Sequence, residues 1–311
     1  MVVFRSISHS DVDSVASVEA WEPVGFIDSD RFRAEYAERQ YRDEWTWIAE
    51  REGRIVARAL WWGRPDSALP ISLDCLWADT NEDDPAGRCA GLISTALAQL
   101  HADGLVQVPD YNLDLAPDWT DDAAAVAAVG WRLDAVRAAG MDRENERIQF
   151  EWRADQPVPA GHDAVRFIEA EDEDFVAIFE RVAVGSLDVL TRHSLESMGP
   201  EGQARDDLEF YSGLPGERSW WRIATTTDGT VIGCSIPSRS AYEASVSYLG
   251  VVPEQRGNRY VDALLAEITR VHADHGAPRI TGMTDVTNVP MAAAFRRAGY
   301  SVVRHRVVVS A

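Results

Sequence analysis

The residues best suited to bind an anion lie between positions 245 and 261. Alternating apolar residues over 245–251 predict a strand, and a turn containing Gly257 connects it directly to an amphipathic helix. A strand that ends at such a turn presents unpaired backbone N–H groups and the positive end of the helix dipole. The arrangement predicts a pyrophosphate site, and the guanidinium groups of Arg256 and Arg259 are expected to contact its oxygens.

A second candidate position lies on the next helix along the chain. A predicted strand over residues 279–283 is followed by a segment in which Asn288 can cap a helix and Pro290 fits its first turn. Phe295 and Tyr300 are interpreted as core packing because they lie at helical spacing.

Together these two segments resemble the GNAT acetyltransferases. The acyl-CoA motif of that family is Gln or Arg, two residues, Gly, one residue, then Gly or Ala. The sequence departs from it twice, with Arg259 at the central glycine and Val261 at the last small residue. The resemblance implies that acetyl-CoA, or another short acyl-CoA, is bound by Arg256, Gly257, Asn258, Arg259, Tyr260 and Val261, with Asn288 facing the pantetheine arm.

The resemblance also implies how the strand before the motif takes part. It would diverge from its neighbour near Leu249 and Gly250, where a glycine makes a bulge inexpensive. The backbone of Leu249 and Val251 would then be free to pair with the pantetheine and to polarise the thioester.

Acyl transfer to an amine also needs a proton acceptor for the amine and a proton for the departing thiolate. Many family members place a tyrosine on the last helix where Phe295 stands, so Tyr248 is the candidate acid. Glu243, in the turn before the strand, is the candidate base. The other titratable groups considered are Glu254, interpreted as a solvated loop charge, together with Asp285 and His193.

The elements that position these residues occur twice in the chain. Each half begins with a strand and an acidic helix start and continues with a hairpin, whose turns are at Glu52-Gly53 and Asp228-Gly229. The element order predicts a mixed α/β sheet with helices on its faces, in two tandem GNAT-like acyl-CoA N-acyltransferase domains. The predicted ranges are a degenerate copy at 1-153, a proline-rich linker at 154-163 and the acyl-CoA-binding domain at 164-311.

The first half has a different sequence at the position of the pyrophosphate turn. Asp79, Glu82, Asp83 and Asp84 would place four negative charges around a dianion, and Arg88 alone would not cancel them. We therefore expect no CoA in this half, which would instead pack against the other half or help to shape the acceptor cleft.

Composition limits the remaining function classes. The chain has 311 residues and a net charge of −21, which fits two domains and disfavours nucleic acid or an anionic membrane as a partner. No apolar run is long enough for a membrane span and no signal peptide is evident, so a cytoplasmic protein is expected. Cys75, Cys89 and Cys234 have no spacing typical of a disulfide framework or a metal site.

The sequence thus predicts an acetyl-CoA-dependent N-acetyltransferase acting on a small, cationic amine attracted to an acidic cleft. The alternative is a non-catalytic acyl-CoA-binding or interaction protein, because Arg259 replaces a glycine and Phe295 a tyrosine. A narrower third interpretation is a tandem acetyltransferase that completes a low-molecular-weight thiol. The sequence does not indicate an oligomer and identifies neither the acceptor nor the acyl chain.

Overall fold

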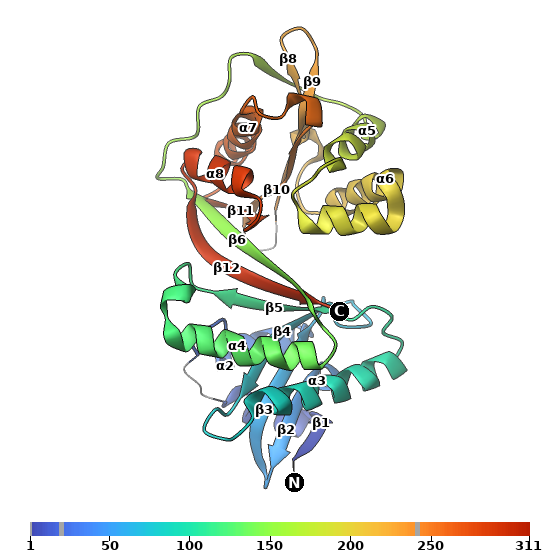
Figure 1. The fold of residues 1–311 in the computed structure, drawn as a ribbon, viewed down its shortest axis with the longest axis vertical. Coiled ribbons are helices and arrows are strands. Elements are labelled where there is room, and N and C mark those ends of the chain that lie inside the picture. The colour runs from blue at the N-terminus through green and yellow to red at the C-terminus, as the bar shows by residue number, and fades with distance from the viewer. Residues whose placement is uncertain (1, 19–21, 240–242) are drawn as a thin grey trace. The chain divides into compact units, whose positions relative to one another are not determined.

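The computed structural model describes residues 2–18, 22–239 and 243–311 (Figure 1). It forms two compact units, each with its own core. Unit 1 comprises residues 1–146 and 305–311, and unit 2 comprises residues 147–304.

Unit 1 is a mixed sheet with helices on both faces. Helices α1 (Val12–Ala16) and α2 (Ser29–Ala37) pack on one face, and α3 (Pro85–Ala102) and α4 (Ala123–Ala138) pack on the other. Its strands follow the order β1-β2-β3-β4-β5-β12. Their bounds are Val3–Ser6 for β1, Thr46–Arg51 for β2, Arg54–Trp62 for β3, Ser72–Ala78 for β4, Asp110–Leu115 for β5 and Ser301–Ser310 for β12.

Unit 2 repeats this plan with a different set of helices. Helices α5 (Asp172–Ala183) and α6 (Val189–Ser212) pack on one face of its sheet, and α7 (Tyr260–Asp274) and α8 (Val289–Arg297) on the other. The strand order is β6-β11-β10-β9-β8-β7. The strands span Arg143–Arg153 for β6, Val165–Ile168 for β7, Arg222–Thr226 for β8, Val231–Arg239 for β9, Ala244–Val251 for β10 and Arg279–Asp285 for β11.

The terminal strand of each sequence half pairs in the unit built mainly from the other half. Residues 147–153 of β6 pair antiparallel with β11, and residues 305–309 of β12 pair antiparallel with β5. The compact units therefore differ from the predicted ranges 1-153 and 164-311 at these two strands. In this arrangement β6 completes the sheet of unit 2 and β12 completes the sheet of unit 1. Residues 154–163, the predicted linker, form neither helix nor strand.

Local features of the sequence account for several elements. Both predicted hairpins are present, β2–β3 and β8–β9, and Glu52 and Gly53 both adopt positive φ in the first turn. The three cysteines are buried free thiols. In the part of the chain that the structure describes, no helix combines the length and the apolar character needed to cross a membrane.

Candidate functional site

Strand β10 separates from its parallel neighbour β11 in the middle of unit 2. The two strands pair only where Ala244–Val246 faces Ile280–Gly282, whereas β10 pairs with β9 along its whole length. Beyond Val246, the β11 side of the β10 backbone has no strand partner. The sequence predicted this divergence, but the bulge falls at Ser247 rather than at Gly250.

Two adjoining clefts open beside this divergence. Cleft A, about 540 Å³, lies between α6, the middle of β10, the end of β11 and α8. Cleft B, about 480 Å³, lies between the end of β10 and the start of α7. The two clefts adjoin, because both are lined by Val182, Ser186, Leu249, Asn288 and Met291.

The N terminus of α7 lies in cleft B without a side-chain cap. The residue before the helix, Arg259, has φ 61° and ψ 16°, a left-handed conformation that favours the glycine of the family motif. Within the described ranges its guanidinium group has no hydrogen-bonding or ionic partner. Gly257, with φ +84°, has nothing within 4 Å of the position of a Cβ. The loop therefore offers free amide donors and a free cation, which fit a pyrophosphate.

Arg256 has a different role from the one predicted. Its guanidinium group donates to the backbone carbonyls of Val182 at 2.7 Å, Val184 at 2.9 Å and Gly185 at 3.2 Å, and to that of Val251 at 3.1 Å. Arg256 therefore ties the C-terminal end of α5 to the end of β10, and four of its five N–H groups are occupied. It lines cleft B as a brace for the loop rather than as a free phosphate ligand.

The other predicted cofactor residues divide between the cleft and its support. Leu249, Val251, Tyr260 and Val261 line cleft B. The Asn258 side chain instead donates to the Gln255 carbonyl oxygen at 3.2 Å and closes the loop.

Asn288 is the predicted cap of α8 and also lines the clefts. Its Oδ1 accepts from the Met291 backbone N–H at 3.4 Å as the N-cap of α8, and the residue lines both clefts.

Gly250 is required at the junction of the clefts. A Cβ there would clash with Cγ1 of Val182 and would lie 3.2 Å from the Tyr248 hydroxyl oxygen. The close approach of β10 to α5 therefore depends on a missing side chain, and it places the Tyr248 phenol beside the open stretch of backbone.

Tyr248 packs in an aromatic cluster on the wall of cleft A. Its ring lies 4.9 Å from that of Phe179 and 5.3 Å from that of Tyr211, between centroids. Burial, the largest cause, raises the pKa of Tyr248 well above its ordinary value. The phenol therefore keeps its proton at neutral pH and can serve as a donor.

Asp207, on α6, is a carboxylate of cleft A that the sequence did not single out. Burial raises its pKa to about 7, the nearby Asp206 and Asp188 carboxylates add to the rise, and the hydrogen bond from Gln203 opposes it. A carboxyl group with this pKa can take up a proton near neutral pH. Its sequence context, two successive acids in a helix, looks like a solvated surface, and only the packing of α6 reveals the difference.

Glu243 lies in the predicted turn before β10, but its side chain faces away from the clefts and towards β11. Its carboxylate accepts from the Thr281 hydroxyl at 3.0 Å and pairs with Arg279 at 3.2 Å, and it lines neither cleft. Glu243 precedes β10, whereas the divergence lies past Val246, so the strand carries the two apart. The geometry thus argues against Glu243 as the base and assigns it to holding β11 against the start of β10.

The remaining candidate titratable groups either form ion pairs or lie outside both clefts. Glu254 forms an exposed ion pair with Arg181. Asp285 is fully buried, pairs with Arg147 at 3.1 Å and accepts from the Val189 backbone N–H at 2.7 Å. His193 is exposed and lines neither cleft.

Unit 1 also has a bulged strand that diverges from its neighbour and a left-handed residue before a helix, but the N terminus of that helix is capped. Strand β4 pairs with β5 only through Ser72 and Leu73, and its bulge lies at Asp74. Asp84 precedes α3 with φ 57°, as Arg259 precedes α7. However, the Asp84 carboxylate accepts from the Gly87 backbone N–H at 2.8 Å, so the helix N terminus is already capped by its own chain.

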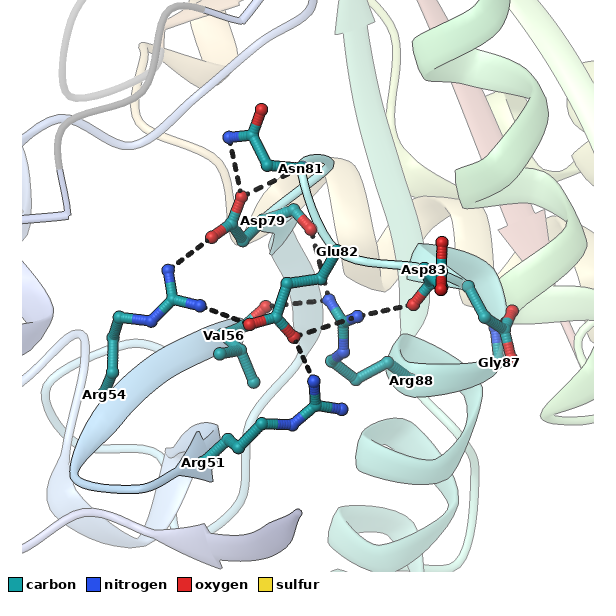
Figure 2. A network of polar contacts seen from close by, with 10 residues as sticks. Arg51, Arg54, Val56, Asp79, Asn81, Glu82, Asp83, Gly87 and Arg88 are labelled. Atoms are coloured by element: carbon teal, nitrogen blue, oxygen red, sulfur yellow. Dashed lines mark hydrogen bonds and ion pairs between the residues drawn. The ribbon is translucent and has the colours of Figure 1, made fainter. Parts of the chain in front are cut away.

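Two acidic residues of this turn in unit 1, Asp79 and Glu82, are paired with arginines, as Figure 2 shows. Glu82 pairs with Arg51 at 2.8 Å, with Arg54 and, at 3.5 Å, with the buried Arg88, while Asp79 pairs with Arg54 at 2.7 Å. The sequence predicted uncancelled repulsion around a lone arginine. The structure instead has three arginines and a closed network.

The sequence matches no protein family model and resembles no curated protein. Solved structures do match over the whole chain. A GCN5-related N-acetyltransferase from Sphaerobacter thermophilus is 15% identical with a TM-score of 0.56, covering 99% of this chain and 94% of that one. A tandem GNAT protein from the clavulanic acid biosynthesis pathway, in a structure without acetyl-CoA, is 14% identical with a TM-score of 0.52, covering 100% and 98%.

A third match is the glucosamine N-acetyltransferase region of a fungal multi-domain β-N-acetylglucosaminidase. It is 13% identical with a TM-score of 0.53, and the alignment covers 99% of this chain and 38% of that chain. The fold of this protein is therefore that of the GNAT acetyltransferases, including one tandem member.

Proposed function

We propose, from the fold shared with the GNAT acetyltransferases, that this chain is an acetyl-CoA-dependent N-acetyltransferase acting on the amine of a small, cationic acceptor. The observation that carries the proposal is the uncapped N terminus of α7, which faces cleft B beside the open backbone of β10. Cleft B leads into cleft A, where Asp207 has a pKa near 7. An uncapped helix N terminus, an unpaired stretch of strand and a carboxyl group with a raised pKa thus occur together in unit 2, and they support the proposal.

Acetyl-CoA would be held by the residues that fit its parts. The α7 amides and Arg259 suit the pyrophosphate, and the open backbone at Leu249 and Val251 suits the amides of the pantetheine. When bound, the cofactor supplies an acyl group activated as a thioester.

Asp207 and Tyr248 would handle the protons. The Asp207 carboxylate accepts a proton from the ammonium group of the acceptor and so releases a neutral, nucleophilic amine. The Tyr248 phenol, which stays protonated at neutral pH, would give its proton to the departing sulfur and take one back from the nitrogen of the new amide. Tyr248 thus keeps its predicted role, while Asp207 replaces Glu243 as the base.

Unit 1 would be a degenerate copy that binds no CoA. Its turn before α3 is filled by Asp84 and by the arginine network around Glu82. In addition, Trp77 occupies the β4 position that corresponds to Gly250, three residues past the bulge in each strand. A large side chain there excludes the close approach that Gly250 permits.

Calorimetry with acetyl-CoA, followed by an amine panel scored by thiol release, tests this proposal. We expect one molecule of acetyl-CoA bound per chain and thiol release with at least one cationic amine. No heat with acetyl-CoA would remove the proposal. Binding without turnover on any amine would favour the second candidate, a non-catalytic acyl-CoA-binding protein, which is motivated by Phe295. Phe295 stacks on Phe150 at 4.7 Å and offers no phenol where many family members have one.

A further inference from the structure

Phe210 is an exposed aromatic side chain on the wall of cleft A. Its side chain is 60% exposed, and no other phenylalanine or tryptophan in the described part of the chain is as accessible. A phenylalanine ring that is exposed to water lacks the stabilisation that burial would give it. A ring held in this way at a cleft is available to cover an apolar group of a ligand.

The position of Phe210 relates it to Asp207. Asp207, Phe210 and Tyr211 are spaced as i, i+3 and i+4 on α6, so they lie on one face of the helix, and all three line cleft A. The helical rise separates Asp207 from Phe210 by about 4.5 Å along the axis. A ligand with its cationic end at Asp207 therefore meets the Phe210 ring after a short spacer.

The other segment of α6 also contributes one apolar side chain to cleft A. Gly199, with φ 73° and ψ 174°, divides α6 into two segments, and Pro200 begins the second. The first segment contributes Leu190, which is 48% exposed and lines the same cleft as Phe210. Two exposed apolar side chains from separate helical segments thus border one opening.

The charges of cleft A suit a single cation. Arg147 is paired with Asp285 at 3.1 Å and with Asp188 at 3.6 Å. Among the described residues, Asp207 has a hydrogen bond from Gln203 but no cationic partner. A ligand with one ammonium group would satisfy this carboxylate, whereas a second ammonium group would find no second unpaired carboxylate in the lining.

We infer that the acceptor is a monoamine carrying an aromatic or bulky aliphatic group a few bonds from its nitrogen, and that Phe210 selects for that group. The inference rests on the proposed acetyl transfer and narrows its acceptor class. Polyamines and polar amines bind more weakly because they leave Phe210 and Leu190 exposed to water.

Three amines and two variants test this inference. The amines are 2-phenylethylamine, ethanolamine as a polar monoamine, and putrescine as a diamine. For the wild-type protein with acetyl-CoA, we expect kcat/KM to be at least about tenfold higher for 2-phenylethylamine than for either other amine. F210A should raise KM for 2-phenylethylamine about tenfold and leave KM for ethanolamine unchanged. M198A is the matched control, because Met198 is an exposed apolar residue of α6 outside the cleft lining, and it should change neither value.

Calorimetry with 2-phenylethylamine alone separates this inference from the proposed function. Binding that is weakened by F210A but not by M198A supports the inference even if no amine is acetylated. Equal kcat/KM for 2-phenylethylamine and ethanolamine, an equal effect of F210A on both amines, or no binding of 2-phenylethylamine would each overturn it.

Discussion

The packing around Asp207 changes the acid–base behaviour of its carboxyl group. The side chain of an aspartate in water loses its proton at a pH well below neutral. On α6, burial and two neighbouring carboxylates raise the pKa of Asp207 to about 7. A base is most effective when its pKa lies near the working pH, because it is then both unprotonated and a good proton acceptor. Asp206, its exposed neighbour in the sequence, has the same side chain without this environment.

The first prediction concerns the pH dependence of activity. The wild-type kcat/KM should fall as the pH drops below about 7, because protonated Asp207 cannot accept a proton. D207N should lower kcat by roughly 10²- to 10⁴-fold and abolish this acid limb. Steady-state rates from pH 5.5 to 9 measure both effects. D206N, which removes only a smaller contribution to the pKa of Asp207, should keep kcat near the wild-type value and move the acid limb slightly to lower pH. An acid limb that persists in D207N would exclude Asp207 as the base.

A second prediction concerns the stability cost of the same residue. Because the pKa of Asp207 is higher in the folded chain than in the unfolded chain, the folded state holds this proton more tightly. The stabilisation is complete below the unfolded pKa and is lost as the pH rises through about 7. D207N, which has no such charge, should therefore unfold at a higher temperature than the wild type at pH 8. The difference should shrink towards pH 4, and a constant difference at both pH values would contradict the assignment.

At the scale of elements, the turns before α7 and α3 have the same backbone conformation but carry different side chains. Arg259 and Asp84 both occupy the left-handed region, with φ 61° and φ 57°. The Asp84 carboxylate returns to cap its own helix, whereas the Arg259 side chain leaves the α7 amides open. One residue per turn thus separates a capped helix N terminus from an uncapped one.

The third prediction separates the charge of Arg259 from its backbone strain. R259A and R259G both remove the guanidinium group, so each should raise the Kd of acetyl-CoA about tenfold. Only R259G also relieves the left-handed strain, which should stabilise the fold by about 1 kcal/mol relative to R259A. Calorimetry and denaturant unfolding measure the two effects. An unchanged Kd in both variants would mean that the guanidinium group does not meet the cofactor.

The elements predicted from the sequence are those set by local signals. The hairpins follow from their turn residues, and Asn288 caps α8 because a polar residue precedes the apolar face of a helix. Glu243 was predicted to be the base because it is close to the divergent part of β10 in sequence. Along an extended strand, however, residues a few positions apart lie far apart in space. Five residues of extended chain carry Tyr248 about 16 Å from Glu243. Asp207 was missed because its burial depends on contacts that no local pattern records.

At the scale of the whole molecule, the two units share a sheet order and a divergent strand, β4 or β10, but their charges are arranged differently. Unit 2 leaves a cation and helix amides open at cleft B, whereas unit 1 closes the matching turn with ion pairs around Glu82. Arg88 is central to that network, since its side chain is only 5% exposed and it also donates to the carbonyls of Val56 and Asp83. We infer that the turn in unit 1 stabilises its own fold and that binding belongs to unit 2.

The last prediction tests this division of roles with E82Q. The substitution removes the negative partner of the buried Arg88 and should lower the free energy of unfolding by about 2–3 kcal/mol. E173Q, which breaks an exposed pair with Arg205, should leave the free energy of unfolding nearly unchanged. In both variants acetyl-CoA should bind once per chain with the wild-type Kd, because Glu82 and Glu173 lie outside clefts A and B. A second equivalent of acetyl-CoA bound by the wild type, or a Kd altered by E82Q alone, would show that unit 1 takes part in binding.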